Sequence, residues 1–419
     1  MNILLIGNGF DLAHDLPTTY KDFIYFCAAA ESIYTFNEET RVSEYVEKCE
    51  SLSHIDAHLR EKLIELYKSR HCEVKIQEKG IRRVKVSTED EFLDELYELL
   101  NKNTWYEWFE SENIIGNGWI DFEAEISRII VALDSLKRFM DAGGKFLEYQ
   151  GNNFDLLRTL ANNKNTWKPM VKAFSIDSLV FIKQLENDLD RIIRALEIYL
   201  TAYVSTIPVK KKLKEIDKLD ITHVLSFNYT DTYRKCYGHG KDIEYDYIHG
   251  VAKLDDSIDA CNMVLGIDEY LTPDMVDKDT TFIAFKKFYQ RIYKGNGAEY
   301  LDWLDEIRCN MIEEQKEIEL EHYNDRLFDP SIVRNRDYDN VTNLYIFGHS
   351  LNVTDADVLK SFICNDNVQT HIFYHRESLN DREDLKKKVA NFTKVIGPEK
   401  LIRRTGGPDR TIEFIAQEL

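Results

Sequence analysis

The sequence predicts an α/β protein in which a doubly wound parallel sheet is interrupted by a large helical insertion. Short apolar strands alternate with helical segments near the N-terminus and again after residue 220, which is typical of a parallel sheet with helices on both faces. The segment between these regions has apolar residues at helical spacing. Polar residues and glycines gather where the predicted strands end, and open parallel sheets bind ligands outside those carboxyl ends.

Length and charge limit the classes of protein that this chain can belong to. Its 419 residues suffice for two or three domains, or for one core with a large insertion. The 54 basic and 74 acidic side chains give a formal net charge of −20. We therefore expect no direct nucleic-acid binding, because an acidic chain repels the phosphate backbone. The same charge disfavours an anionic membrane surface, and no apolar run is long enough to span a bilayer.

The seven cysteines are scattered and include no C-x-x-C pair. This pattern favours reduced thiols over a disulfide framework or a structural zinc site. The N-terminus has no basic segment followed by a long apolar core, so we expect no signal peptide. These features predict a cytoplasmic protein, and they leave open whether it forms a homo-oligomer.

Short apolar runs that end in polar residues predict the strands of the core. They are Asn2–Ile6, Ile221–Tyr229, Glu244–Gly250, Asn262–Asp268, Asn343–Leu351 and Thr370–His375. Helices are expected from about Thr281 to Leu320, which keeps the strand–helix alternation. We assign residues 1–29 together with 215–419 to this core.

Residues 30–214 are expected to form the insertion. Helical spacing runs through residues 41–70, 89–110, 120–140 and 176–206. His71–Ser87 instead alternates apolar and polar residues around Lys79-Gly80, which predicts a β-hairpin.

Candidate site residues stand at the ends of the predicted strands. In chain order they are Gly7, Asn8, Gly9, Phe10 and Asp11; Asn228 and Asp231; His249 and Gly250; Gly266–Asp268; and Gly348, His349 and Ser350. A glycine turn between a strand and a helix can present backbone N–H groups to a phosphate. The third glycine of the dinucleotide fingerprint is absent, because Leu12 occupies its place.

Several of these residues also have structural explanations. Gly7-Asn8-Gly9 is a common type of turn, and Asn228 is a good N-cap for the helix that follows it. His249 can be a buried structural histidine, while His349 and Ser350 fit a strand-end turn with a capping serine. These alternatives stay open at the level of sequence.

Acidic residues outside the strand ends have structural explanations too. Asp355 and Asp357 are most simply explained by the dipole at a helix N-terminus. Asp121, Glu123 and Glu125 fit a solvated helix face, although a metal-dependent nuclease could use such carboxylates. No G-x-S-x-G elbow and no H-E-x-x-H motif occurs, which disfavours the corresponding hydrolases.

Several of these motifs together resemble the AbiH family, which is implicated in bacterial abortive infection by phage. They are "LLIGNGFDLAHDLPTTYKDF", "WIDFE", "SFNYTDTY", "YIHG", "LGID", "FKKFYQRIYK" and "IFGHSL". The resemblance covers most of the chain. It implies a role in antiphage defence, with a phage-derived trigger or partner protein.

The order of the motifs is also similar to that of sirtuin-like NAD-binding domains. Gly7 and Gly9 match the glycines of a G-A-G-x-S turn, and Leu16-Pro17 matches the "IP" that follows it. Asn228 matches the asparagine of an N-x-D strand end, and His249-Gly250 matches the later H-G pair. "GHSL" resembles the late G-x-S-L element.

This second resemblance has departures. Asn8 replaces the alanine, Asp11 replaces the serine, and Thr230 replaces the aspartate, with Asp231 one place later. The cysteine quartet that binds zinc is missing, so a protein deacylase is disfavoured.

The sirtuin-like similarity implies a Rossmann-like core that binds NAD, or a related nucleotide, and hydrolyses its nicotinamide–ribose bond. Asn228 and His249 would be catalytic. The nucleotide would contact Gly7, Asn8, Gly9, Phe10, Asp11, Pro17, Asp231, Gly250, Gly348, His349 and Ser350, without a metal ion. The alternatives are a nucleotide-binding sensor or toxin without hydrolase activity, and the nuclease.

Overall fold

The computed structural model divides the chain into two compact units. It describes residues 1–37, 39–76, 82–115, 121–151, 156–158, 160, 178–254, 257–267, 280–321, 340–407 and 410–418. The first unit comprises Met1–Leu16, Val209–Val251 and Gly295–Leu419. The second comprises Pro17–Pro208 and Ala252–Lys294.

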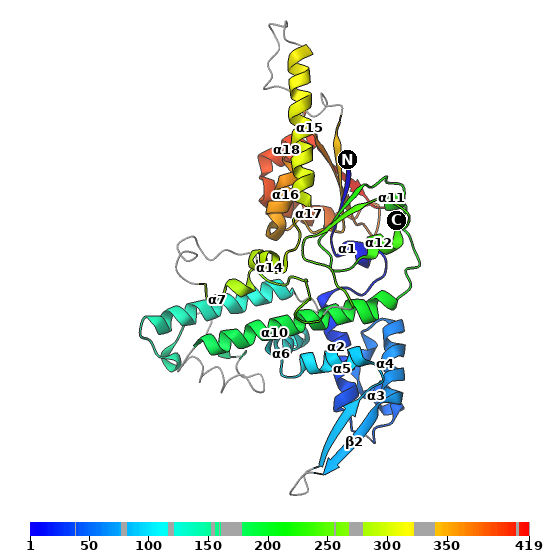
Figure 1. Cartoon of the computed structure of the whole chain (residues 1–419), viewed down its shortest axis with the longest axis vertical. Coiled ribbons are helices and arrows are strands. Elements are labelled where there is room, and N and C mark those ends of the chain that lie inside the picture. The colour runs from blue at the N-terminus through cyan, green and yellow to red at the C-terminus, as the bar shows by residue number, and fades with distance from the viewer. Residues whose placement is uncertain are drawn as a thin grey trace. The chain divides into compact units, whose positions relative to one another are not determined.

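The first unit is built on a six-stranded parallel sheet (Figure 1). Its strands are β1 (Asn2–Ile6), β4 (His223–Ser226), β5 (Glu244–Tyr247), β6 (Thr342–Phe347), β7 (Val368–Tyr374) and β8 (Ile412–Ala416). They lie in the order β5-β4-β1-β6-β7-β8, and every neighbouring pair is parallel. The order reverses between β1 and β6, as in a Rossmann-like sheet. The predicted doubly wound α/β fold is therefore confirmed.

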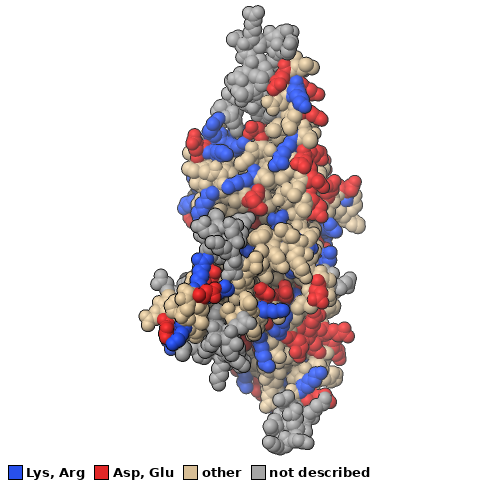
Figure 2. Space-filling view, turned by 60° about the vertical axis from the view of Figure 1, so that its left-hand side comes forward, with Lys and Arg blue, Asp and Glu red and all other residues tan. Residues whose placement is uncertain are grey.

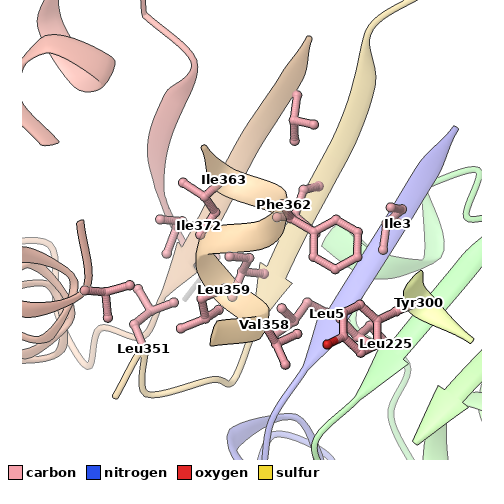
Figure 3. Close-up of a cluster of buried hydrophobic side chains, with 14 of the residues drawn as sticks. Ile3, Leu5, Leu225, Tyr300, Leu351, Val358, Leu359, Phe362, Ile363 and Ile372 are labelled. Atoms are coloured by element: carbon pink, nitrogen blue, oxygen red, sulfur yellow. The ribbon is translucent and has the colours of Figure 1, made fainter. Parts of the chain in front are cut away.

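Helices cover both faces of this sheet because its central strands are apolar on both sides. In β1, Ile3 and Leu5 belong to one buried cluster, and Leu4 and Ile6 belong to the other. The helices of the first cluster are α15 (Tyr300–Glu321), α16 (Ala356–Ile363), α17 (Glu383–Ile396) and α18 (Pro398–Gly406). Figure 3 shows part of this cluster, where side chains of α16 meet those of the sheet. The helices of the second cluster are α1 (Gly9–Leu12), α11 (Lys214–Asp217) and α12 (Thr232–Cys236).

The strand predicted at Asn262–Asp268 is wrong. Only an isolated bridge between Ile267 and Lys286 forms there, and Asp268 lies outside the described residues. The Gln290 side chain exchanges hydrogen bonds with the backbone of Leu265, at 3.0 and 2.9 Å, so a side chain takes the place of a neighbouring strand. The sixth strand of the sheet is β8 instead, a short apolar run that pairs with the open edge of β7.

The second unit is mainly helical. It contains α2 (Tyr20–Thr35), α3 (Val42–Lys48), α4 (Ala57–Ser69), α5 (Glu91–Leu100), α6 (Thr104–Ile115), α7 (Phe122–Asp141), α10 (Ser178–Ile198) and α14 (Lys287–Lys294). The predicted hairpin is present as β2 (His71–Ile76) and antiparallel β3 (Arg82–Ser87). The turn at Lys79-Gly80 lies outside the described residues.

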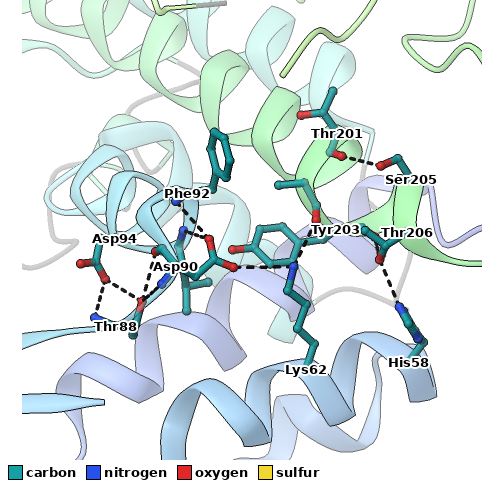
Figure 4. Close-up of polar contacts among 12 residues, drawn as sticks. His58, Lys62, Thr88, Asp90, Phe92, Asp94, Thr201, Tyr203, Ser205 and Thr206 are labelled. Atoms are coloured by element: carbon teal, nitrogen blue, oxygen red, sulfur yellow. Dashed lines mark hydrogen bonds and ion pairs between the residues drawn. The ribbon is translucent and has the colours of Figure 1, made fainter. Parts of the chain in front are cut away.

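Polar residues break the predicted long helices into shorter ones. The stretch 89–110 divides into α5 and α6 at Lys102, whose φ of 58° ends α5. The side chain of Asn103 then accepts the N–H groups of Trp105 and Tyr106, which caps α6. Likewise, Asp90 caps α5 and pairs with Lys62, 3.6 Å away, next to Tyr203 (Figure 4).

The boundaries of the two units differ from the expected ones: residues 17–29 and 252–294 belong to the second unit, and residues 209–214 belong to the first. Helix α2 belongs to the second unit because Phe23 and Phe26 pack on Tyr199, with ring centroids 5.6 and 5.0 Å apart. The Tyr199 hydroxyl also donates to the Pro17 carbonyl at 2.7 Å.

The described surface is rich in acidic side chains. Figure 2 shows Asp and Glu in several groups, with Lys and Arg scattered between them. Within the described part of the chain, no helix is long and apolar enough to cross a membrane.

Replacing Phe362 by alanine should destabilise the first unit by about 3–5 kcal/mol, because its fully buried ring leaves a cavity between α16 and the sheet. Ile402→Ala, on an exposed position of α18, should change stability by less than about 0.5 kcal/mol. Hydrogen exchange of β6 and β7 amides in increasing urea reports the first unit alone. Equal effects of the two substitutions would contradict the packing described for α16.

Candidate functional site

Four neighbouring strands end at one edge of the sheet in the first unit, and the candidate residues follow them there. Gly7–Asp11 follow β1, Asn228 follows β4, His249 follows β5, and Gly348-His349 follow β6. Because the strands are parallel, these loops share the carboxyl edge. The edge includes the point between β1 and β6 where the strand order reverses, which is where doubly wound sheets bind ligands.

The loops after β1 and β6 touch backbone to backbone. A Cβ atom at Gly7 would lie 2.8 Å from the Cα of His349, and one at Gly9 would lie 2.8 Å from the Cα of Gly348. Gly348 has a φ of 68°, and a Cβ there would lie 2.2 Å from the Phe10 nitrogen. These glycines are therefore required by the close approach of the two loops.

The same contact uses N–H groups of the turn. Gly7 donates to Phe347 O at 3.1 Å, Gly9 donates to Gly348 O at 2.9 Å, and Phe10 donates to Gly7 O at 2.8 Å. These three donors are thus engaged within the protein. The N–H groups of Gly7, Gly9 and Phe10 are therefore not available to bind a phosphate.

Asp11 and Asn228 form a buried polar pair that contacts this turn. The Asn228 amide nitrogen donates to Gly7 O at 3.0 Å and to Asp11 Oδ2 at 3.2 Å. The Thr230 hydroxyl donates to the same Asp11 oxygen at 2.6 Å. Only the NH₂ end of an amide can meet two acceptors, so these partners set the orientation of Asn228. Asn228 is therefore not the cap of the following helix.

Two acceptor oxygens of this pair are buried without a hydrogen-bond partner among the described residues. They are Asp11 Oδ1 and Asn228 Oδ1. Burial raises the pKa of the Asp11 carboxyl from its ordinary 3.8 to about 6, although the hydroxyls of Thr230 and Thr232 oppose the rise. Buried acceptors without donors are rare in native proteins, and both of these oxygens can still accept a hydrogen bond.

Beside this pair, two histidines flank one carboxylate. His349 Nε2 lies 3.2 Å from Asp355 Oδ2, and His249 Nε2 lies 3.6 Å from Asp355 Oδ1. The ring of Phe227 packs edge-on against both imidazoles, with centroids 4.5 Å from His349 and 5.6 Å from His249. All four side chains are largely or partly buried within the first unit.

The backbone decides the tautomer of His349. The Leu351 N–H donates to His349 Nδ1 at 3.0 Å, so this nitrogen carries a lone pair and Nε2 carries the proton. The Nε2–H group is therefore the one that lies 3.2 Å from Asp355 Oδ2. If His349 bound a metal ion through Nε2, its Nδ1 would carry the proton and donate it instead. Across the described ranges, no group of three or more His, Cys, Asp or Glu side chains is placed to hold a metal ion.

The other predicted site residues differ in their exposure and in the contacts that they make. Asn8 and Ser350 are exposed, Gly250 has a φ of 78° in the turn after β5, and Asp231 pairs with Lys235 at 2.9 Å. The fully buried Phe10 ring belongs to the core and packs edge-on against Phe347. Pro17 and Gly266 belong to the second unit.

Sequence analysis missed the role of Asp355. The sequence explains Asp355 by the dipole at the N-terminus of α16. In the structure it does stand there, but its side chain makes no capping hydrogen bond. It lies against two histidines that follow different strands, 106 and 6 positions earlier in the chain. No spacing in the sequence indicates that contact.

The carboxylates of the nuclease alternative have separate partners in the second unit. Asp121 caps α7, Glu123 pairs with Lys287 at 2.7 Å, and Glu125 accepts the indole N–H of Trp108. Their contacts are thus accounted for by helix capping and packing.

Fold and site together define a class: an α/β protein with Rossmann-like strand order and a buried polar site at the carboxyl edge of its sheet. The family model described as Bacteriophage abortive infection AbiH matches residues 3–375. The chain belongs to the AbiH family, which confirms the resemblance of its motifs and implies a role in abortive infection. Comparison with curated proteins and with solved structures found no match.

Asp11→Asn should remove a pH dependence of stability. With a pKa of about 6 in the folded state and 3.8 when exposed, ionisation of Asp11 opposes folding. The stabilisation by its protonated form is therefore complete below about pH 4 and lost as the pH rises through about 6, by about 3 kcal/mol. The unfolding free energy of the wild type, relative to D11N, should fall over this range. A difference that stays constant between pH 4 and 8 would contradict the burial of this carboxyl.

Gly348→Ala should destabilise the first unit by more than about 4 kcal/mol, because it adds a backbone clash to a left-handed conformation. Gly240→Ala is the matched control: its φ is 74°, but a Cβ there meets nothing within 4 Å. It should cost only about 1–2 kcal/mol. The yield of folded protein and the exchange of β1 and β6 amides measure both. Similar costs would mean that the two loops do not touch.

Proposed function

We propose that the first unit binds NAD, or a related nucleotide, at the carboxyl edge of its sheet and hydrolyses the nicotinamide–ribose bond during abortive infection. A phage-derived molecule would act as the trigger. The observation that carries this proposal is the pair of buried oxygens, Asp11 Oδ1 and Asn228 Oδ1, that have no donor among the described residues.

A ribose supplies the groups that this pair needs. Its two hydroxyls on neighbouring carbons are donors, and the pair offers two acceptors. An unpaired buried acceptor costs about 1–3 kcal/mol, which ligand hydroxyls would recover. In this proposal Asn228 and Asp11 orient the ribose at the ends of the strands.

The reaction makes limited demands on the protein. The leaving nicotinamide is cationic and departs as a neutral molecule with the bonding electron pair, through an oxocarbenium-like state. A water oxygen then bonds to the ribose carbon, and its proton needs an acceptor. His249 is suited to this because imidazole titrates near neutral pH. Its place beside Asp355 supports this role.

A nucleotide-binding sensor without hydrolase activity is the second candidate. The observation that favours it is that both hydrogens of the Asn228 amide are already engaged, by Gly7 and Asp11. Only the amide oxygen is left to meet a ligand, which suffices for binding.

Incubating the purified full chain with NAD should release nicotinamide, detected by chromatography. Cells that express the chain should lose NAD after phage infection. Asn228→Ala and His249→Ala should each lower cleavage by about 10²–10⁴-fold, because each removes a positioned group. His239→Ala, on an exposed loop of the first unit, is the matched control and should leave cleavage unchanged.

Calorimetry with NAD separates the two candidates. Binding that is lost in Asn228→Ala without any cleavage, in solution or in infected cells, would favour the sensor. If the wild type neither binds nor cleaves the nucleotide under any of these conditions, the proposed function is overturned.

A further inference from the structure

We propose that Asp355 is a positioning residue for His249: it holds His249 with Nε2–H toward the carboxylate, so that Nδ1 is the nitrogen that accepts a proton. The catalytic part of this inference rests on the proposed function. The tautomer itself can be measured without any activity.

The geometry places one carboxylate between two imidazoles. Each Asp355 oxygen faces a different ring, at 3.2 Å for His349 and 3.6 Å for His249. The exposed fraction of the side chain is 13% for Asp355, 4% for His349 and 9% for His249. Solvent therefore screens the interaction between the carboxylate and the imidazoles only weakly. The carboxylate thus has a separate oxygen for each histidine.

His349 is a fixed donor in this arrangement. Because Leu351 N–H occupies its Nδ1, His349 can present only Nε2–H to Asp355. The second carboxylate oxygen, 3.6 Å from His249 Nε2, is left to attract a proton on that nitrogen. When neutral His249 points a proton at this oxygen, the proton is on Nε2. Its Nδ1 then has the lone pair and can act as the base.

The loop is built to maintain this donor. Leu351 adopts a φ of 57°, which is unfavourable for a non-glycine residue, and its side chain is fully buried in the core cluster (Figure 3). Two side chains of α17 hold the preceding carbonyls: Lys388 donates to His349 O at 2.6 Å, and Asn391 donates to Ser350 O at 3.0 Å. The conformation that points Leu351 N–H at His349 is thus stabilised by the core packing of the Leu351 side chain and by the two hydrogen bonds from α17.

Asp355 also lies where negative charge is favoured. It stands at the N-terminus of α16, whose dipole attracts an anion, and it makes no capping hydrogen bond there. Among the described residues, Lys388 brings a positive charge to the His349 carbonyl, and Asp384 lies 3.7 Å from the Lys388 ammonium.

The proton balance of the step is simple. As the water oxygen bonds to the ribose carbon, its proton moves to His249 Nδ1. The carboxylate of Asp355 then stabilises the imidazolium, as the aspartate does in a Ser-His-Asp arrangement. His349 keeps its proton throughout, and the imidazolium later releases the proton to solvent.

Nitrogen-15 NMR of the full chain with labelled histidine tests the proposal directly. In the wild type at high pH, His249 should carry its proton on Nε2 and a lone pair on Nδ1, assigned with the variant His249→Gln. A neutral His249 with its proton on Nδ1 overturns the proposal, whether or not the chain cleaves NAD.

Asp355→Asn supplies the second measurement. The imidazole pKa of His249 should fall by about one unit, because the opposite charge is removed. Asp357→Asn, an exposed position on the same first turn of α16, is the matched control for the helix dipole and should leave that pKa unchanged. A His249 pKa that is the same in Asp355→Asn and in the wild type also overturns the proposal.

Activity separates this inference from the proposed function. In a chain that cleaves NAD, Asp355→Asn should lower kcat by about 10²–10⁴-fold, with little change in KM. The acid limb of the pH–rate profile should also move to lower pH. Asp355→Glu should restore part of the rate. A wild type without cleavage overturns the proposed function, while the nitrogen signals still decide whether Asp355 sets the tautomer.

Discussion

The rest of the site depends on one contact, the backbone-to-backbone packing of the loops that follow β1 and β6. The ladder between these strands continues past their ends, since Gly7 donates to Phe347 O and Gly9 donates to Gly348 O. Side chains at Gly7, Gly9 or Gly348 would force the loops apart. The contact brings Asp11, which follows the first loop, and His349, which lies in the second, to the same edge of the sheet at the point where the strand order reverses.

Around this contact the site has two parts with different chemistry. Asp11 and Asn228 present buried acceptor oxygens, which suits recognition of hydroxyl donors. The two histidines and Asp355 can hold and move a proton, with the tautomer of one ring set by a backbone N–H. In the proposed reaction, the first part would orient the ribose and the second part would accept the proton of the attacking water. Membership of the AbiH family gives such a reaction a setting in abortive infection.

Sequence patterns predicted much of the fold because strands and helices differ in the period of their apolar residues. Alternation of strands and helices predicted a parallel sheet, and the polar residues at strand ends predicted Asn228, His249 and His349. Patterns failed where pairing decides the outcome. Residues 262–268 resemble a strand but pair with the Gln290 side chain, whereas 412–416 become β8 because β7 offers an open edge.

The sequence by itself determined the α/β class, the glycines of the β1 turn and most residues of the carboxyl edge, because these follow from local composition and spacing. Tertiary structure alone decided which of these residues meet. It placed Asp355 between two histidines, engaged the turn's N–H groups at Gly7, Gly9 and Phe10, and left two acceptor oxygens buried. Hydrogen-bond partners and burial depend on residues far apart in the chain, so no local pattern carries them.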